Sequence, residues 1–288
     1  MVTTTADLDI VPLSPALGAE VRGLDLRREM SPETVTRVMD AWHRHIVLLF
    51  RGQELDENEQ ISFAGQLGTI AERGRPAARR HEDKKINPTF TLITNIRENG
   101  KPIGTLPDGE MWFHHDTCYT EVPHKGSFLY AIEVPDQGGD TMFTNMYAAY
   151  ENLPQAVKDR LAGLNVLQVY DYDRPVNQRF DITGGLDGLR HFSHPAVITH
   201  PVTGRKALYV NRLMTAGIEG MAPEESDALL EVLFDYGERR EIVYQHVWVP
   251  GDLVMWDNLC STHARTDFSP DQTRLLRRCV IVGERPRA

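Results

Sequence analysis

Two histidines and one aspartate in this sequence could hold a metal ion. Residues 112–116 read WFHHD and continue a strand-like pattern, in which alternate side chains point to opposite faces. His114 and Asp116 are therefore expected to point the same way, with His115 on the other face. His263, just past another strand-like run, would supply a second imidazole. Two imidazoles and one carboxylate on one side of iron(II) leave positions open for an oxidant and a cosubstrate, whereas structural zinc sites are closed. The three residues together predict a catalytic non-haem iron site, although each one alone is better explained as a buried histidine or a turn aspartate.

An arginine and a threonine could bind a carboxylate beside that metal. Arg274 lies eleven residues after His263 and begins an alternating run over residues 274–280, in which Arg274 and Arg278 share one face. A guanidinium on a rigid strand is suited to bidentate binding of a carboxylate, and a nearby hydroxyl would complete such a site. Thr141 directly follows a Gly-Gly-Asp turn and is the candidate hydroxyl; its alternative is an ordinary strand threonine.

The elements that must position these residues are mostly short strands. Two helices come first: Ser31 is the N-cap of an amphipathic helix that ends near His45, and Asp56 caps a second helix. An unbroken apolar run over residues 46–50 predicts a buried strand between them, and a third helix is predicted over residues 223–236. The other predicted strands cover residues 89–96, 111–118, 126–134, 141–145, 205–210, 241–249, 252–256 and 275–282. This pattern favours a mainly β fold, a sandwich or jelly roll with flanking helices.

Length and composition limit what the protein can be. The chain has 288 residues with 31 Lys and Arg against 41 Asp and Glu, so its formal net charge is −10, which disfavours nucleic-acid binding. Its apolar runs are shorter than the roughly 20 residues that a membrane helix needs, and no signal peptide is visible, so a cytoplasmic protein is expected. Three cysteines without a C-x-x-C pair are expected to be reduced packing thiols. No internal repeat or boundary is evident, which predicts one domain over residues 1–288.

Four motifs in a fixed order make the chain resemble a known family. They are F-H-x-D at 113–116, G-G-D-T at 138–141, W-D-N-x(4)-H at 256–263 and H-x(10)-R at 263–274. This combination resembles the taurine dioxygenase-like (TauD/TfdA-type) family of iron(II)/2-oxoglutarate-dependent dioxygenases, and the similarity covers almost the entire chain. The resemblance implies a double-stranded β-helix core, also called a jelly roll or cupin-like fold, which agrees with the predicted strands.

The resemblance also implies cofactors and roles for individual residues. The family uses iron(II), 2-oxoglutarate and O2, and releases succinate and CO2 while it hydroxylates a substrate. His114, Asp116 and His263 match the iron ligands of the family. Thr141 and Arg274 match the contacts to the distal carboxylate of 2-oxoglutarate. Arg278 matches an arginine that contacts anionic substrates.

The substrate that the resemblance implies is a small anionic molecule, either a sulfonate or an aryloxy or alkyl carboxylate. Hydroxylation next to a heteroatom would cleave its C–S or C–O bond. Asn95 and the loop over residues 99–106 are expected to line the substrate pocket. An active-site lid or insertion is expected around residues 73–106 and 171–191, which lack a clear period. The basic part of the first region, residues 73–85, is otherwise a solvated loop.

Three other functions would use the same residues differently. A tailoring oxygenase of the same fold would hydroxylate or desaturate a larger secondary metabolite. A non-oxidative jelly-roll metallohydrolase would hold zinc and an activated water, but it leaves Arg274 and Thr141 without a role. A non-catalytic metabolite-binding protein is the third, and the complete set of metal ligands argues against it. A homodimer or homotetramer is compatible with each of them.

Overall fold

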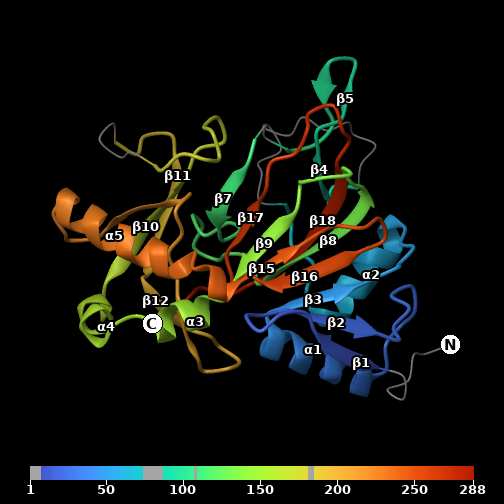
Figure 1. The fold of residues 1–288 in the computed structure, drawn as a ribbon, viewed down its shortest axis with the longest axis horizontal. Coiled ribbons are helices and arrows are strands. Elements are labelled where there is room, and N and C mark those ends of the chain that lie inside the picture. Colours follow the sequence, from blue (N-terminus) through green and yellow to red (C-terminus); the bar gives the residue numbers. More distant parts are fainter. Residues whose placement is uncertain (1–7, 74–86, 107–108, 181–184) are drawn as a thin grey trace.

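The computed structural model describes residues 8–73, 87–106, 109–180 and 185–288. In these ranges the fold is mainly β, with helices at its periphery (Figure 1). Two sheets carry the candidate site. One has seven strands in the order β1-β2-β3-β16-β8-β18-β4, and the other has four in the order β15-β9-β17-β7. The mainly β fold with flanking helices that was predicted is therefore confirmed.

The seven-stranded sheet is antiparallel except for the parallel pair β2 and β3. Its centre is fully buried: all four residues of β3 are inaccessible to solvent, as the unbroken apolar run predicted. Its strands are β1 (Asp9–Pro12), β2 (Ala19–Arg22), β3 (Val47–Phe50), β16 (Leu253–Asp257), β8 (Gly126–Glu133), β18 (Leu275–Ile281) and β4 (Thr91–Thr94).

Two N-terminal helices, α1 (Pro32–His45) and α2 (Glu57–Leu67), pack beside this sheet (Figure 1). Ser31 caps α1 by accepting a hydrogen bond from the Thr34 N–H, and Asp56 caps α2 in a capping box with Glu59. Trp42 from α1 and Phe63 from α2 lie against Phe128 of β8. Both helices therefore begin where their cap residues predicted.

The four-stranded sheet brings the motif residues side by side. Its strands are β15 (Val243–His246), β9 (Thr141–Thr144), β17 (His263–Arg265) and β7 (Met111–His114). In the pairing of β17 with β7, His263 lies opposite His114. In the pairing of β15 with β9, His246 lies opposite Thr141. Segments that are distant in the sequence are thus held in one register.

The middle of the chain contains elements that the sequence analysis missed. Those with no predicted counterpart are helices α3 (Met146–Glu151) and α4 (Gln155–Leu161) and strands β10 (Asn165–Tyr170), β11 (Arg190–Pro195), β12 (Val197–Thr199) and β14 (Thr215–Ile218). They lie with β13 (Lys206–Leu208) and α5 (Pro223–Gly237) on the opposite side of the molecule from α1 and α2 (Figure 1). The two-stranded hairpin β5 (Arg97–Glu98) and β6 (Lys101–Pro102) and the 3-10 helix Arg240–Ile242 complete the fold. Several of these elements are too short or too polar for a periodic signal.

Two further predictions have an outcome in the structure. The described part of the predicted insertion contains no helix or strand before β11, which begins at Arg190; residues 74–86 of the other predicted lid lie outside the described residues. All three cysteines are buried and free, as predicted. None of the described helices is long and apolar enough to cross a membrane.

Candidate metal centre and cosubstrate pocket

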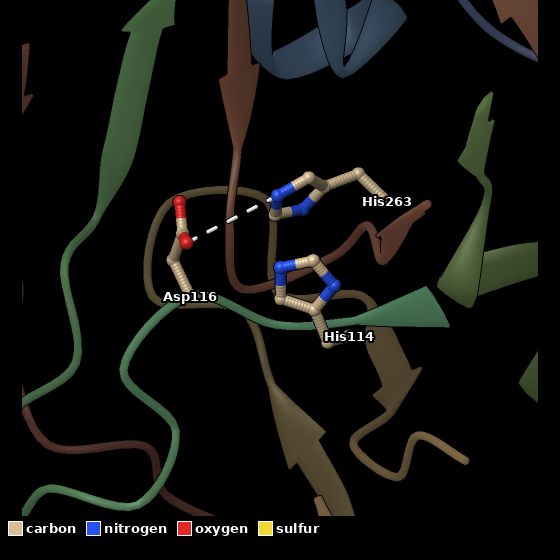
Figure 2. Close-up of side chains that lie close together, drawn as sticks. All are labelled: His114, Asp116 and His263. Atoms are coloured by element: carbon tan, nitrogen blue, oxygen red, sulfur yellow. Dashed lines mark ion pairs between the residues drawn. The ribbon is translucent and has the colours of Figure 1, made fainter. Parts of the chain in front are cut away.

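The structure brings His114, Asp116 and His263 together (Figure 2). One ligand atom from each lies within 4.8 Å of the others, and each residue is at most 8% exposed. His263 Nε2 is 4.0 Å from an Asp116 carboxylate oxygen, and the two imidazole rings are 4.1 Å apart. His114 ends β7 and His263 begins the neighbouring strand β17, so the sheet itself sets the distance between the imidazoles.

A turn places Asp116 next to the two histidines, and not the predicted strand. The predicted strand over 111–118 ends at His114, so alternation along a strand does not place Asp116. The chain turns there, with Thr117 in the left-handed region at φ 54°. Asn258 holds this turn: its carbonyl accepts from the Asp116 N–H at 2.7 Å, and its amide donates to the Asp116 and His124 carbonyls, both at 2.8 Å. The Asn of the W-D-N motif therefore positions the carboxylate.

A second group of residues with metal-binding side chains, His200, Asp257 and Cys260, supports the same turn. His200 Nδ1 accepts hydrogen bonds from the Val202 and Thr203 N–H groups, so the proton is on Nε2. Nε2 donates it to Asp257 at 3.0 Å. Because both ring nitrogens are used, this group is explained by hydrogen bonding, which fixes the backbone just before Asn258.

The charges around His114, Asp116 and His263 suit a divalent cation. Burial alone would raise the pKa of Asp116, but Arg278, at 2.8 Å, and the two imidazoles outweigh burial and hold that pKa well below its usual range. Ser127 donates a 2.7 Å hydrogen bond to the other carboxylate oxygen. Burial lowers the pKa of both His114 and His263, which keeps the imidazoles neutral as metal binding requires. His114 Nδ1 donates to the Trp112 carbonyl at 2.9 Å, which leaves Nε2 for a metal.

Replacing Asn258 with Ala is expected to loosen this turn. Three buried backbone groups would lose their partner, which should lower the free energy of unfolding by about 2–4 kcal/mol. Affinity for Mn(II) should fall by about 10- to 100-fold, the range for residues that support metal ligands. Denaturant unfolding and calorimetric Mn(II) titration would measure the two effects. Asn152→Ala, at an exposed helix end, is the matched control; equal behaviour of the two variants would contradict the role of Asn258.

Arg274 is a buried guanidinium that could bind an anion. The side chain is 1% exposed, and its Nε donates to the Gly139 carbonyl at 3.1 Å. Its Nη1 is buried without a partner among the described residues, and burial lowers its pKa to about 9. Gly138 and Gly139 adopt positive φ angles of 75° and 68°, and a Cβ on Gly139 would lie 3.3 Å from Arg274. The glycine turn thus lets the backbone approach the buried guanidinium closely.

One cavity of about 150 Å³ extends from the three candidate metal ligands to Arg274. Six of the predicted site residues line it: His114, Asp116, His263, Thr141, Arg274 and Arg278. Leu106 from the loop over 99–106 also lines it, as do Tyr170 at the end of β10 and Tyr172 in the predicted insertion.

Asn95 is the predicted site residue that the structure places elsewhere. It is not among the residues that line the cavity. Its amide donates to the Gln272 carbonyl at 2.8 Å, and its carbonyl accepts from the Arg274 N–H at 3.0 Å. Both polar atoms are used by the segment that leads into β18 and contains Arg274, so we correct its expected role from substrate contact to support for that arginine.

Several residues that build the site were missed by sequence reasoning. They are Asn258, Ser127, His200 and Trp248, whose indole N–H donates to Thr141 Oγ1 at 3.0 Å. Asn258 stands inside the W-D-N motif, and its place in that motif was the available signal. Ser127 and Trp248 carry no local signal, because their partners are distant in the sequence.

Comparison with known proteins agrees with this geometry. The family model "Taurine catabolism dioxygenase TauD, TfdA family" matches residues 9–280. The chain belongs to this family. A pentalenolactone F synthase from Streptomyces avermitilis is 32% identical over 296 residues, which cover 97% of this chain and 95% of that protein. An alpha-ketoglutarate-dependent 2,4-dichlorophenoxyacetate dioxygenase from Burkholderia sp. (strain RASC) is 32% identical over 289 residues, covering 96% and 94%.

One similar protein has been solved with bound ligands. The crystal structure of AAD-2 in complex with Mn(II) and N-oxalylglycine superimposes with a TM-score of 0.78 at 27% identity, over 98% of this chain and 99% of that one. TauD/TfdA family members use iron(II), 2-oxoglutarate and O2. The protein is therefore an iron(II)/2-oxoglutarate-dependent dioxygenase, and the resemblance seen in its motifs is confirmed.

Proposed function

We propose that His114, Asp116 and His263 bind the iron, and that Thr141 and Arg274 bind the distal carboxylate of 2-oxoglutarate. The observation that carries this proposal is the cavity itself, which joins three buried ligand side chains to a buried guanidinium with an unused N–H group. Iron(II), 2-oxoglutarate and O2 together supply the oxidising chemistry, with succinate and CO2 as coproducts.

The chain's own residues hold, orient and shield the reactants. Arg274 and Thr141 fix one end of the cosubstrate, while the imidazoles and the carboxylate set the position of the metal. Buried walls keep bulk water away from both. We further propose that the seven- and four-stranded sheets are the two sheets of a double-stranded β-helix, and that residues 1–288 act as one domain.

We propose an anionic substrate. Arg278 lines the cavity and already pairs with the Asp116 carboxylate. A divalent cation on Asp116 would neutralise the charge that Arg278 now offsets, which leaves the guanidinium able to pair with a substrate carboxylate or sulfonate.

The wall next to Asp116 supports a substrate with an apolar ring. Tyr119 and Tyr170 stack with their ring centroids 4.8 Å apart and 10° between planes, and Tyr172 meets Tyr170 edge-on at 4.9 Å. Met214 and Val176 complete this side of the cavity. Aromatic and thioether surfaces favour a flat apolar body over a small polar one. We therefore favour an aryloxy or alkyl carboxylate over a short sulfonate such as taurine.

A tailoring oxygenase is the second candidate, because relatives include a pentalenolactone F synthase at 32% identity. The apolar wall is compatible with a larger carbocyclic metabolite. In that case Arg278 would bind a carboxylate at one end of the molecule.

Anaerobic reconstitution with iron(II) and 2-oxoglutarate tests the proposed function. We expect a visible charge-transfer band that shifts when a substrate is added and bleaches on exposure to oxygen, leaving succinate. Phenoxyacetate, taurine and a carbocyclic carboxylate, tested in parallel, distinguish the substrate classes. Product formed with zinc and without O2 would instead support the metallohydrolase. If taurine were the best substrate, the proposed role of the tyrosine wall (Tyr119, Tyr170 and Tyr172) would be contradicted.

Replacing Arg278 with Ala is expected to damage substrate binding selectively. The KM for the anionic substrate should rise about tenfold or more, which corresponds to the loss of one charge-assisted hydrogen bond. Decay of 2-oxoglutarate in the absence of substrate should persist. Since Arg278 also pairs with Asp116, Mn(II) affinity must be measured in the same variant. A loss of Mn(II) affinity with an unchanged KM would mean that Arg278 serves the metal ligand only.

A further inference from the structure

Trp248 lies against the position proposed for the distal carboxylate of 2-oxoglutarate. Its indole Nε1 is 3.0 Å from Thr141 Oγ1, and the two residues are 6% and 4% exposed. The pairing of β15 with β9 places His246 opposite Thr141, and Trp248 follows His246 by two residues. The register of β15 with β9 thus brings the segment that follows β15 to Thr141, and both side chains of the contact are buried.

The direction of this hydrogen bond determines what the threonine can do. An indole N–H can only donate, so the Thr141 oxygen is the acceptor and its own proton remains unused. Among the described residues, Trp248 is the one hydrogen-bond partner of the Thr141 side chain. Thr141 and Arg274 both line the cavity. The hydroxyl proton is thus available to an anion that enters beside Arg274.

We infer that Trp248 is a positioning residue for the cosubstrate: it orients the Thr141 hydroxyl as a donor to the distal carboxylate of 2-oxoglutarate. The inference rests on the proposed role of Thr141. In a chain of donors that ends on an anion, each hydrogen bond polarises the next, so the indole also strengthens the hydroxyl as a donor.

Surrounding residues hold the indole in one orientation. The His246 ring meets Trp248 edge-on, with centroids 4.5 Å apart and 88° between planes. Tyr244 contacts His246 Nδ1 at 3.1 Å, and Asp252 lies 3.1 Å from Nε2. Arg51 binds the Asp252 carboxylate at 2.9 Å. Polar contacts therefore connect Arg51 and Asp252 to His246, and the ring of His246 packs against the indole.

Trp248→Phe separates positioning from packing, because it keeps an aromatic ring and removes the N–H. The readout is calorimetric binding of N-oxalylglycine and of 2-oxoglutarate to the Mn(II)-loaded protein, which involves no turnover. We expect the dissociation constants to rise about three- to tenfold, as for loss of one neutral hydrogen bond. Trp42→Phe, a buried indole in the helix-covered core, is the matched control and should leave both constants unchanged.

A double-mutant cycle with Thr141→Val shows whether Trp248 acts through the hydroxyl. Thr141→Val alone should weaken binding, and adding Trp248→Phe should have no further effect. If the two losses multiply, or if Trp248→Phe binds like wild type, the inference is overturned while the role of Thr141 stands. If Thr141→Val has no effect, the proposed role of Thr141 itself fails. Thermal unfolding without ligand confirms that each variant is folded, and Trp248→Met, which also lacks a donor, replaces the Phe variant if that one does not fold.

Discussion

Alanine in place of His114, Asp116 or His263 is expected to abolish succinate formation from 2-oxoglutarate. Each residue contributes one of three buried ligand atoms that lie within 4.8 Å of one another, and no other described His, Cys, Asp or Glu side chain is grouped with them. Replacement of a residue that only supports a metal ligand lowers activity or metal affinity by about 10- to 100-fold. Replacement of a ligand itself should have a larger effect.

Bound iron and succinate, measured on the same samples, check this prediction. Both should fall together in all three variants. His191→Ala removes an exposed imidazole and serves as the control. Full iron content with full succinate production in any one variant would remove that residue from the ligand set. Asp116→Ala should in addition leave Arg278 without its 2.8 Å partner, so its stability must be measured separately.

The grouping of the three candidate ligands could be predicted from sequence, but the means of placing one of them could not. The H-x-D spacing suggested a continuous strand, whereas the strand ends at His114 and Asp116 is held by Asn258, which is 142 residues away. Sequence periodicity describes neighbours along one element. It contains no information on a side chain that holds a turn from a different sheet.

The same limit explains the prediction for Asn95. A polar residue near a candidate pocket is as consistent with lining the cavity as with bonding the adjacent strand. Only the register of β18 with β4, in which Leu275 lies opposite Thr94, brings Asn95 to the backbone of Arg274. Long-range pairing of this kind is decided by the whole sheet.

Fold prediction succeeded where local signals are strong. Ser31 and Asp56 cap the first two helices, and an apolar run forms the buried strand β3. The strand β11 has the sequence RHFSHP and lies at the edge of a three-stranded sheet, so neither alternation nor apolar content marks it. The tyrosine wall depends on β10 and the irregular segment after it, and for that reason the substrate pocket was the least predictable part of the site.

Replacing Arg274 with Met is expected to remove cosubstrate binding without destabilising the protein. The guanidinium is 1% exposed, has an unpartnered Nη1 among the described residues, and has a pKa that burial lowers to about 9. A buried cation without its anion opposes folding, and methionine fills similar space without the charge. We expect the dissociation constant for 2-oxoglutarate to rise by about 100-fold or more, since charge-assisted bonds contribute roughly 1.5–3 kcal/mol each.

Calorimetry and thermal unfolding, with and without 2-oxoglutarate, separate the two effects. In the Mn(II)-loaded wild type the ligand should raise Tm, because it binds only the folded state; in Arg274→Met it should not, while the ligand-free Tm stays equal or rises. The matched control is Arg277→Met, on the opposite face of the same strand. Arg277 donates to Gln60, Leu55 and Asp56, so its loss should destabilise the protein by about 2–4 kcal/mol and leave 2-oxoglutarate affinity intact. If Arg274→Met were instead the destabilised variant and still bound 2-oxoglutarate, Arg274 would be a structural arginine and the anion site would have to lie elsewhere in the cavity.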